Sequence, residues 1–264
     1  MLCLRWYSVT ASTTTRPAEA EAFLTTMQDL PPHALTACPE WVVHDVGAHL
    51  AGIYEEVIRH VQAYAAGTPL TSTRTFEERE APLRELAPAE LLRYTDREEE
   101  HMRQEIQEVI ETEPDATLWW AGRWMRVDAF LSHLRNECAL HRWDMVGDDD
   151  TTKKLLANYD LFKHAITNIG SKPLCGRGVE KYGDELSGLD VRIRTAGHPD
   201  LRITVTDAVP TWELVEPEGE ATVIGDQAAR TLLLWGRSPT PATRLEAIGP
   251  HDTVVRLRRL LSGY

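Results

Sequence analysis

The hydrophobic pattern of this 264-residue chain changes once, near residue 150, and that change limits the folds the chain can adopt. Before that point, apolar residues recur every three or four positions, which is the spacing of one face of an α-helix. Beyond it, apolar and polar residues alternate in short runs, which is the period of a half-buried β-strand. The pattern therefore predicts a helical first domain and a second domain that contains a sheet.

Four helices are predicted in the first domain. Each segment carries apolar residues on one face, and Pro31, Gly67 and Pro114 stand where the first three segments end. Four amphipathic helices bury these faces most simply in a bundle, and bundles often build metal sites from inward-facing side chains. The predicted helices cover residues 17–30, 43–66, 88–113 and 127–146.

The second domain is predicted to be smaller and of the α+β class. We place the boundary at Asp150, so a lead-in over 1–15 and a bundle over 16–150 precede an α+β domain over 151–264. A helix over 152–169 and a glycine-rich turn region over 170–178 are expected first. Strands are then predicted at 191–195, 201–206, 211–215 and 221–224, and helices at 227–235 and 251–261.

Charge and composition exclude several classes of partner. The formal net charge is −13, from 28 basic and 41 acidic residues, whereas nucleic acids and anionic membranes are bound by basic surfaces. No apolar stretch reaches the ~18 residues of a membrane-spanning helix, and the first residues do not have the pattern of a signal peptide. We therefore expect a cytoplasmic protein whose four scattered cysteines are reduced thiols.

A carboxylate and an imidazole are paired on the last predicted helix of the bundle. Glu137 and His141 are four residues apart, so they project from one helix face. Such a pair can share a metal ion if a third ligand comes from a neighbouring helix, and His49 lies on the inner face of its own segment. The residues thus predict a metal site, although a surface salt bridge and a hydrogen-bonded core histidine would explain the same residues separately.

His133 is a rival ligand, because His133, Glu137 and His141 form an H-x3-E-x3-H run. Eight residues of helix rise ~12 Å, so both histidines cannot bind one ion through bonds of ~2 Å. Glu137 can thus pair with one of them at a metal, and spacing leaves open which one. Asp45 and Asp144 either orient a nearby imidazole or stabilise their helices. Motifs for serine hydrolysis, phosphate binding and dinucleotide binding are absent from the sequence.

Three sequence motifs resemble a known family, the mycothiol-dependent maleylpyruvate isomerases, whose N-terminal domains are DinB-like metal-binding bundles. The resemblance extends from about Arg16 to Leu261 and is weaker in the C-terminal part. The motifs are Cys38-Pro39-x-Trp41 with Asp45-Val46-x-Ala48-His49-Leu50-Ala51-Gly52, then Glu137-x3-His141-Arg142-Trp143-Asp144, and finally Ala221-Thr222-Val223-x-Gly225 with Leu232-Leu233-Leu234-Trp235-Gly236-Arg237.

The resemblance implies that His49, Glu137 and His141 are the metal ligands, of Zn²⁺ or a similar divalent metal, which favours His141 over His133. It also implies mycothiol as a low-molecular-weight thiol cosubstrate. Arg237 matches a functionally important arginine of the family, so it is implied as a catalytic and cosubstrate-binding residue. The alternative for Arg237 is a helix-end arginine whose guanidinium donates to the last carbonyls of its helix.

A metal held by three such ligands keeps one coordination position open, and a thiol bound there loses its proton near neutral pH. The thiolate can then attack a small electrophilic substrate. Isomerisation of the maleylpyruvate type and S-transfer both remain open, since nothing in the sequence identifies the carbon substrate. A non-catalytic metal-containing protein that binds a thiol conjugate or a small electrophile is the alternative in another class, and a bundle that binds nothing is a third.

Overall fold

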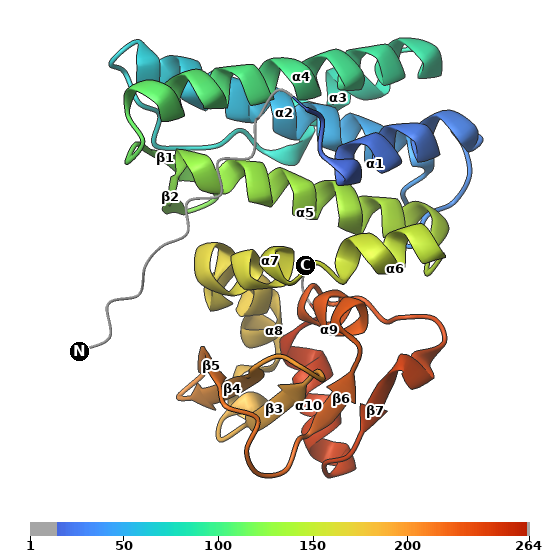
Figure 1. Ribbon diagram of the computed structural model, residues 1–264, viewed down its shortest axis with the longest axis vertical. Helices are drawn as coiled ribbons and strands as arrows, with labels where there is room; N and C mark the ends of the chain where they lie inside the picture. The colour runs from blue at the N-terminus through green and yellow to red at the C-terminus, as the bar shows by residue number, and fades with distance from the viewer. Residues whose placement is uncertain (1–14, 263–264) are drawn as a thin grey trace. The chain divides into compact units, whose positions relative to one another are not determined.

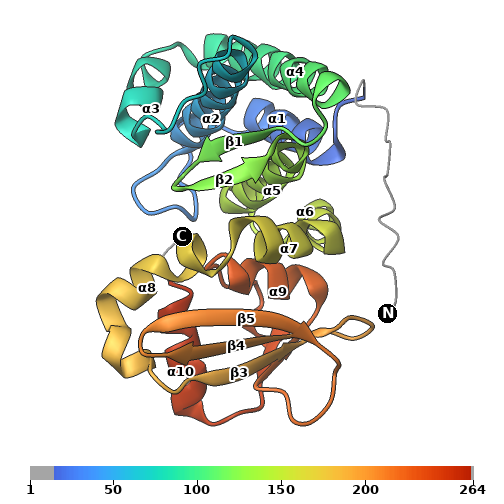
Figure 2. The same cartoon turned by 90° about the vertical axis from the view of Figure 1, so that its left-hand side faces the viewer.

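The computed structural model describes residues 15–262 (Figures 1 and 2), so the predicted lead-in lies, apart from Thr15, outside the described residues. The chain separates into two compact units. The first unit contains the chain up to Pro32 and the stretch His44–Leu131, and the second contains His33–Val43 and the chain from Ser132 onward. Over residues 15–262, no helix combines the length and the apolar character needed to cross a bilayer.

The first unit is built from the helices α1 (Ala18–Asp29), α2 (Val43–Ala65), α3 (Phe76–Arg84) and α4 (Pro88–Thr112). Helix α5 (Val127–Val146) begins in this unit and continues into the second. Apolar residues on the inner faces form the core, and Phe23, Val46 and Ile106 are fully buried there. Helices α1, α2, α4 and α5 begin and end within two residues of the predicted bounds, because each has an apolar stripe and a proline or glycine near at least one end.

Helices α2 and α4 run in the same direction side by side (Figure 1). Tyr94 on α4 donates to Glu55 on α2, and Gln62 further along α2 donates to Glu105 further along α4, over 3.0 Å. Two neighbouring helices can be parallel only if the connection between them returns the chain to its starting end. That connection contains α3, which the sequence did not predict.

A short hairpin leads into α5 and was also missed. Strands β1 (Thr117–Trp120) and β2 (Arg123–Arg126) pair in antiparallel register through a two-residue turn. Both turn residues, Ala121 and Gly122, have positive φ, as a tight hairpin turn of this kind requires. Trp120 on β1 packs edge-on against Phe130 of α5, with 5.4 Å between ring centroids, and so fixes the start of α5.

The second unit contains a five-stranded sheet of order β5-β4-β3-β6-β7. Strands β3 and β6 are parallel, and the other neighbours are antiparallel. Val191, Ile193, Leu201, Ile203 and Val205 alternate with polar residues and are buried, as the period-two pattern predicted. The strands are β3 (Asp190–Arg194), β4 (Asp200–Thr206), β5 (Val209–Val215), β6 (Val223–Gly225) and the unpredicted β7 (Leu245–Ala247).

The second unit also contains helices, and one of them, α10, crosses behind β3 and β4 in Figure 2. The expected helix over 152–169 is broken into α6 (Asp150–Leu156), α7 (Tyr159–His164) and a π-helical turn, η1 (Ala165–Ile169). Helices α9 (Gln227–Leu234) and α10 (His251–Leu260) agree with the prediction. The fold class, a helical N-terminal region followed by a smaller α+β region, is confirmed, and the domain boundary at Asp150 remains a prediction.

The turn predicted over 170–178 is wrong, because residues 171–178 form the first half of helix α8 (Ser171–Leu186) and only Gly170 precedes it. Leu174 and Cys175 are fully buried, and this packing outweighs the low helix propensity of the glycines. Gly178 also has a packing role: a Cβ at this position would lie 2.2 Å from the carbonyl oxygen of Leu260 on α10. Gly178 therefore allows close helix packing here, and neither Gly176 nor Gly178 ends the helix.

Candidate functional site

Glu137, His141 and Asp144 lie on the part of α5 that belongs to the second unit, and all three are buried. One helical turn separates Glu137 from His141, and less than one separates His141 from Asp144, so their side chains meet. Glu137 Oε2 lies 3.4 Å from His141 Nε2, and Asp144 Oδ2 lies 2.9 Å from His141 Nδ1. The imidazole of His141 thus has a carboxylate at each nitrogen.

The rival histidine, His133, also contacts Glu137. Its Nε2 lies 3.8 Å from Glu137 Oε1, a longer separation than that between Glu137 and His141. Glu137 thus contacts both histidines, because its two oxygens face different turns of α5, and which histidine accompanies Glu137 at a metal remains a prediction. The ring of His133 is 5.8 Å from that of His164 on α7, and both histidines are buried.

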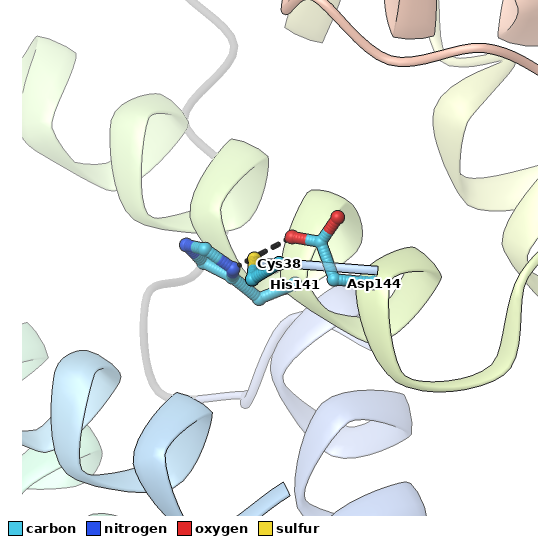
Figure 3. Close-up of side chains that lie close together, drawn as sticks. All are labelled: Cys38, His141 and Asp144. Atoms are coloured by element: carbon cyan, nitrogen blue, oxygen red, sulfur yellow. Dashed lines mark ion pairs between the residues drawn. The ribbon is translucent and has the colours of Figure 1, made fainter. Parts of the chain in front are cut away.

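A segment far away in the sequence completes the surroundings of His141. The thiol of Cys38 and the carboxylate of Asp144 both point toward the imidazole (Figure 3), and the potential ligand atoms of the three residues lie within 4.8 Å of one another. The backbone N–H of Ala37 donates to the carbonyl oxygen of Asp144 over 2.7 Å and so holds this segment against the end of α5. Trp41 stacks on the imidazole at 6.3 Å between ring centroids.

Cys38 lies in the Cys-Pro-x-Trp motif, but the sequence predicted no role for its thiol at the site. Cys138, which is adjacent to Glu137 in the sequence, is buried as a core thiol. Cys38 reaches His141 only because the loop after α1 folds back on α5. No spacing rule predicts such a contact.

Arg237 forms an ion pair with Asp144. Its Nε donates to Asp144 Oδ1 over 2.8 Å and its Nη2 donates to Asp144 Oδ2 over 2.6 Å, which is the bidentate geometry of an arginine–carboxylate pair. Its Nη1 donates to the carbonyl oxygen of Trp235, just after α9, over 3.1 Å. The helix-end contact that was the alternative for Arg237 is therefore present, together with an ion pair that the sequence did not predict.

Hydrogen bonds and neighbouring charges at this cluster raise the pKa of His141 and lower the pKa of Asp144. Burial would lower the pKa of the His141 imidazole, but hydrogen bonds with Asp144, Cys38 and Glu137 outweigh it and raise that pKa well above its ordinary value. Burial would raise the pKa of Asp144, but the hydrogen bonds and charge of Arg237 lower it well below the usual range. The Asp144 carboxylate is thus ionised between Arg237 and His141.

His49 lies on α2 in the first unit and is 6% exposed. Its Nδ1 is 2.7 Å from Glu80 Oε1, a carboxylate of α3 with no exposed surface. Asp45, the acid considered as its orienting partner, instead pairs with Arg84 at 3.6 Å. The predicted triad takes ligands from both units, so joining His49 to Glu137 and His141 remains a prediction.

The chain is similar to known proteins in one domain of its sequence and in its fold. Residues 16–146 match the mycothiol maleylpyruvate isomerase N-terminal domain. Two solved structures share the fold at 14% identity: a histidine-to-alanine mutant of the mycothiol-dependent maleylpyruvate isomerase, with a TM-score of 0.57 over 87% of this chain and 88% of that chain, and the mycothiol-dependent maleylpyruvate isomerase itself, with a TM-score of 0.55 over 84% and 86%. No curated protein sequence matches the chain. Residues 16–146 of this chain therefore form a domain of the mycothiol maleylpyruvate isomerase N-terminal type.

Proposed function

We propose that this protein is a metal-dependent enzyme that activates mycothiol to attack a small electrophilic substrate, by thiol-assisted cis–trans isomerisation of the maleylpyruvate type. The observation that carries the proposal is the buried imidazole of His141 between two carboxylates, Glu137 at Nε2 and Asp144 at Nδ1. An imidazole whose Nδ1 is held by an acid is arranged to bind a metal through Nε2. Glu137 lies on that side of the ring.

The donor set fits a catalytic divalent metal. His49, Glu137 and His141 are the proposed ligands, and all three are less than 8% exposed, at 6%, 3% and 7%. Burial of these polar groups is costly unless each finds a strong partner, and two imidazoles with one carboxylate are the ligand set of open zinc sites. A divalent metal bound there would supply positive charge that favours the thiolate form of a thiol.

Around that metal, Asp144 would keep His141 Nδ1 engaged, and Arg237 would keep Asp144 in place. Three of the five N–H donors of the Arg237 guanidinium are used by Asp144 and Trp235. The same guanidinium is proposed to bind an anionic group of the cosubstrate or substrate. Its side chain is 12% exposed, so only a small part of it is open to such a group.

The isomerisation balances without any redox partner. The thiolate sulfur forms a bond to one carbon of a conjugated double bond, and the electron pair of that double bond moves onto the conjugated carbonyl. The remaining carbon–carbon single bond rotates, after which the electron pair returns and the carbon–sulfur bond breaks. Thiol and metal are unchanged at the end, and only the double-bond geometry of the substrate differs.

A turnover assay with zinc-loaded protein, mycothiol and maleylpyruvate tests the proposal. Isomerisation gives a product of unchanged mass, whereas S-transfer gives a product heavier by the thiol. Omission of mycothiol should abolish turnover. A protein that binds zinc and mycothiol but turns over no electrophile of this class would be the binding protein considered as the alternative, and the proposed activity would be wrong.

A further inference from the structure

Helix α3, the element that the sequence did not predict, supplies a buried acid to His49. Glu80 Oε1 lies 2.7 Å from His49 Nδ1, and the two residues are 31 positions apart in the chain. Glu80 has no exposed surface and His49 is 6% exposed, so water does not compete strongly for this contact. A hydrogen bond so short and so buried strongly restricts the orientation of the ring.

The Glu80 carboxylate is itself held in place. Its Oε2 accepts a hydrogen bond from Arg84 Nη2 over 2.6 Å, and Arg79 Nη2 lies 3.8 Å from its Oε1. Arg84 extends the network to Asp45 at 3.6 Å. Glu80 therefore has partners at both oxygens and does not depend on His49 alone for its position.

The backbone of α2 is adapted to the close approach of α3. A Cβ at Gly52, three residues after His49, would lie 3.2 Å from the Cβ of Arg79 and 3.4 Å from the Cγ of Glu80. Absence of a side chain at Gly52 thus lets α3 come near enough for Glu80 to reach the imidazole. On another side of the ring, Phe76 packs edge-on against His49 at 5.5 Å between centroids.

We propose that Glu80 is the positioning residue of His49: it accepts the Nδ1–H and leaves Nε2 as the nitrogen that binds the metal. This inference rests on the proposed function, because it assigns a role toward a metal ligand. A carboxylate on the far nitrogen fixes the tautomer and the ring orientation and makes the ligand more basic, and loss of such a partner typically lowers metal affinity 10–100-fold.

Zinc affinity, measured by competition with a chromophoric chelator, tests this role in Glu80→Ala and Glu80→Gln. Glu80→Ala removes the acceptor and should weaken zinc binding about 10–100-fold. Glu80→Gln keeps an acceptor oxygen without the charge, so it should recover part of the affinity and settle between wild type and Glu80→Ala. Circular dichroism and a urea melt identify conditions in which every variant is folded.

Glu56→Gln is the matched control. Glu56 is also a fully buried acid, lies on α2 seven positions after His49, and pairs with Arg59 and Arg74. Its loss should lower stability but leave zinc affinity within about threefold of wild type, since losing a group that hydrogen-bonds a metal ligand typically costs tenfold or more. A merely structural Glu80 would behave like this control, and equal zinc affinity in wild type and Glu80→Ala would overturn the inference.

A second readout needs no metal. Nitrogen-15 spectra of the histidine rings, taken on metal-free protein at about pH 8.5, where ordinary imidazole is neutral, report which nitrogen carries the proton. The His49 signal is assigned by its loss in His49→Ala. Wild type should show the Nδ1–H tautomer, and Glu80→Ala should shift the ring toward Nε2–H. If the wild type binds no zinc, the proposed function is wrong. The tautomer still tests Glu80 in that case, because an unchanged tautomer in Glu80→Ala overturns the role assigned to Glu80.

Discussion

At the scale of single residues, Arg237 and Asp144 act as one unit. The guanidinium binds both oxygens of Asp144, and one of those oxygens faces His141 Nδ1. Arginine provides a planar fork that lysine lacks, so Arg237→Lys should loosen Asp144 even though the positive charge remains. If Arg237 acts through Asp144, substitutions at the two residues should have coupled effects. If Arg237 binds substrate directly, their effects should be independent.

Zinc affinity in a double-mutant cycle separates these two roles of Arg237. If the guanidinium acts on the metal through Asp144, then Arg237→Ala and Asp144→Asn should each weaken zinc binding about 10-fold or more, and the double variant should be little worse than either single variant. Additive losses in the double variant would show that Arg237 acts independently of Asp144. An effect of Arg237→Ala on mycothiol KM alone would favour direct cosubstrate binding.

The buried carboxylate of Glu56 should make the free energy of unfolding fall at acid pH. Burial would raise the pKa of Glu56, but hydrogen bonds from His60, Arg59 and Arg74 outweigh burial and lower that pKa far below the ordinary value of 4.5. A folded pKa below the unfolded one gives stability that is complete above about pH 4.5 and is lost as pH falls toward the folded pKa.

Urea unfolding at several pH values checks this linkage. Glu56→Gln should cost about 1–3 kcal/mol at neutral pH, because its charged partners lose the carboxylate charge and one of two acceptor oxygens. The unfolding free energy of this variant should change less than that of wild type below about pH 4.5. Parallel curves for the two proteins across the acid range would contradict the assignment of this pH dependence to Glu56.

At the scale of elements, the glycines of α8 give a matched pair. A Cβ at Gly178 would meet the backbone of Leu260 at 2.2 Å, whereas a Cβ at Gly176 would meet nothing within 4 Å. Gly178→Ala should therefore destabilise the protein by about 1–3 kcal/mol through overpacking. Gly176→Ala should stabilise it by about 0.5–1 kcal/mol, because alanine is the better helix former. Thermal melts measure both, and destabilisation of equal size at both positions would contradict the packing described for α8.

Elements with a clear apolar period were predictable, and those without one were not. Helix α3 has Pro82 within it and buries Arg79 and Glu80, so its sequence has no apolar stripe to detect. It forms because Thr75 and Glu78 cap its start reciprocally and because its charged residues pair with one another and with α2. Glu80 could not be recognised as a partner of His49 without this helix.

The residues of the candidate site likewise fall into those that helical spacing predicted and those that it did not. Glu137 and His141 were identified because four positions on one helix bring side chains together, and the orienting role considered for Asp144 follows from a separation of three. Cys38, Arg237 and Glu80 approach their histidine or aspartate partners from sequence distances that no helical or strand period relates. Their positions depend on how loops and helices pack, which only the folded chain shows.

At the scale of the whole molecule, a bound metal should stabilise the native state. Free zinc at one hundred times its dissociation constant would contribute about 2.7 kcal/mol if the unfolded chain does not bind it, which corresponds to a rise in melting temperature of roughly 5–11 °C for a protein of this size. Scanning calorimetry with zinc and with a chelator measures the shift. The shift should vanish in Glu137→Gln, and an equal shift in that variant would place the zinc elsewhere.

The most direct test is elemental analysis of the purified protein beside its His49→Ala, His141→Ala and His133→Ala variants. The account predicts about one zinc or similar divalent ion per chain in the wild type, as expected for a single catalytic site, loss of that metal in His49→Ala and His141→Ala, and its retention in His133→Ala. A wild type that takes up no metal after reconstitution, or a His49→Ala variant that keeps it, would contradict the proposed metal centre.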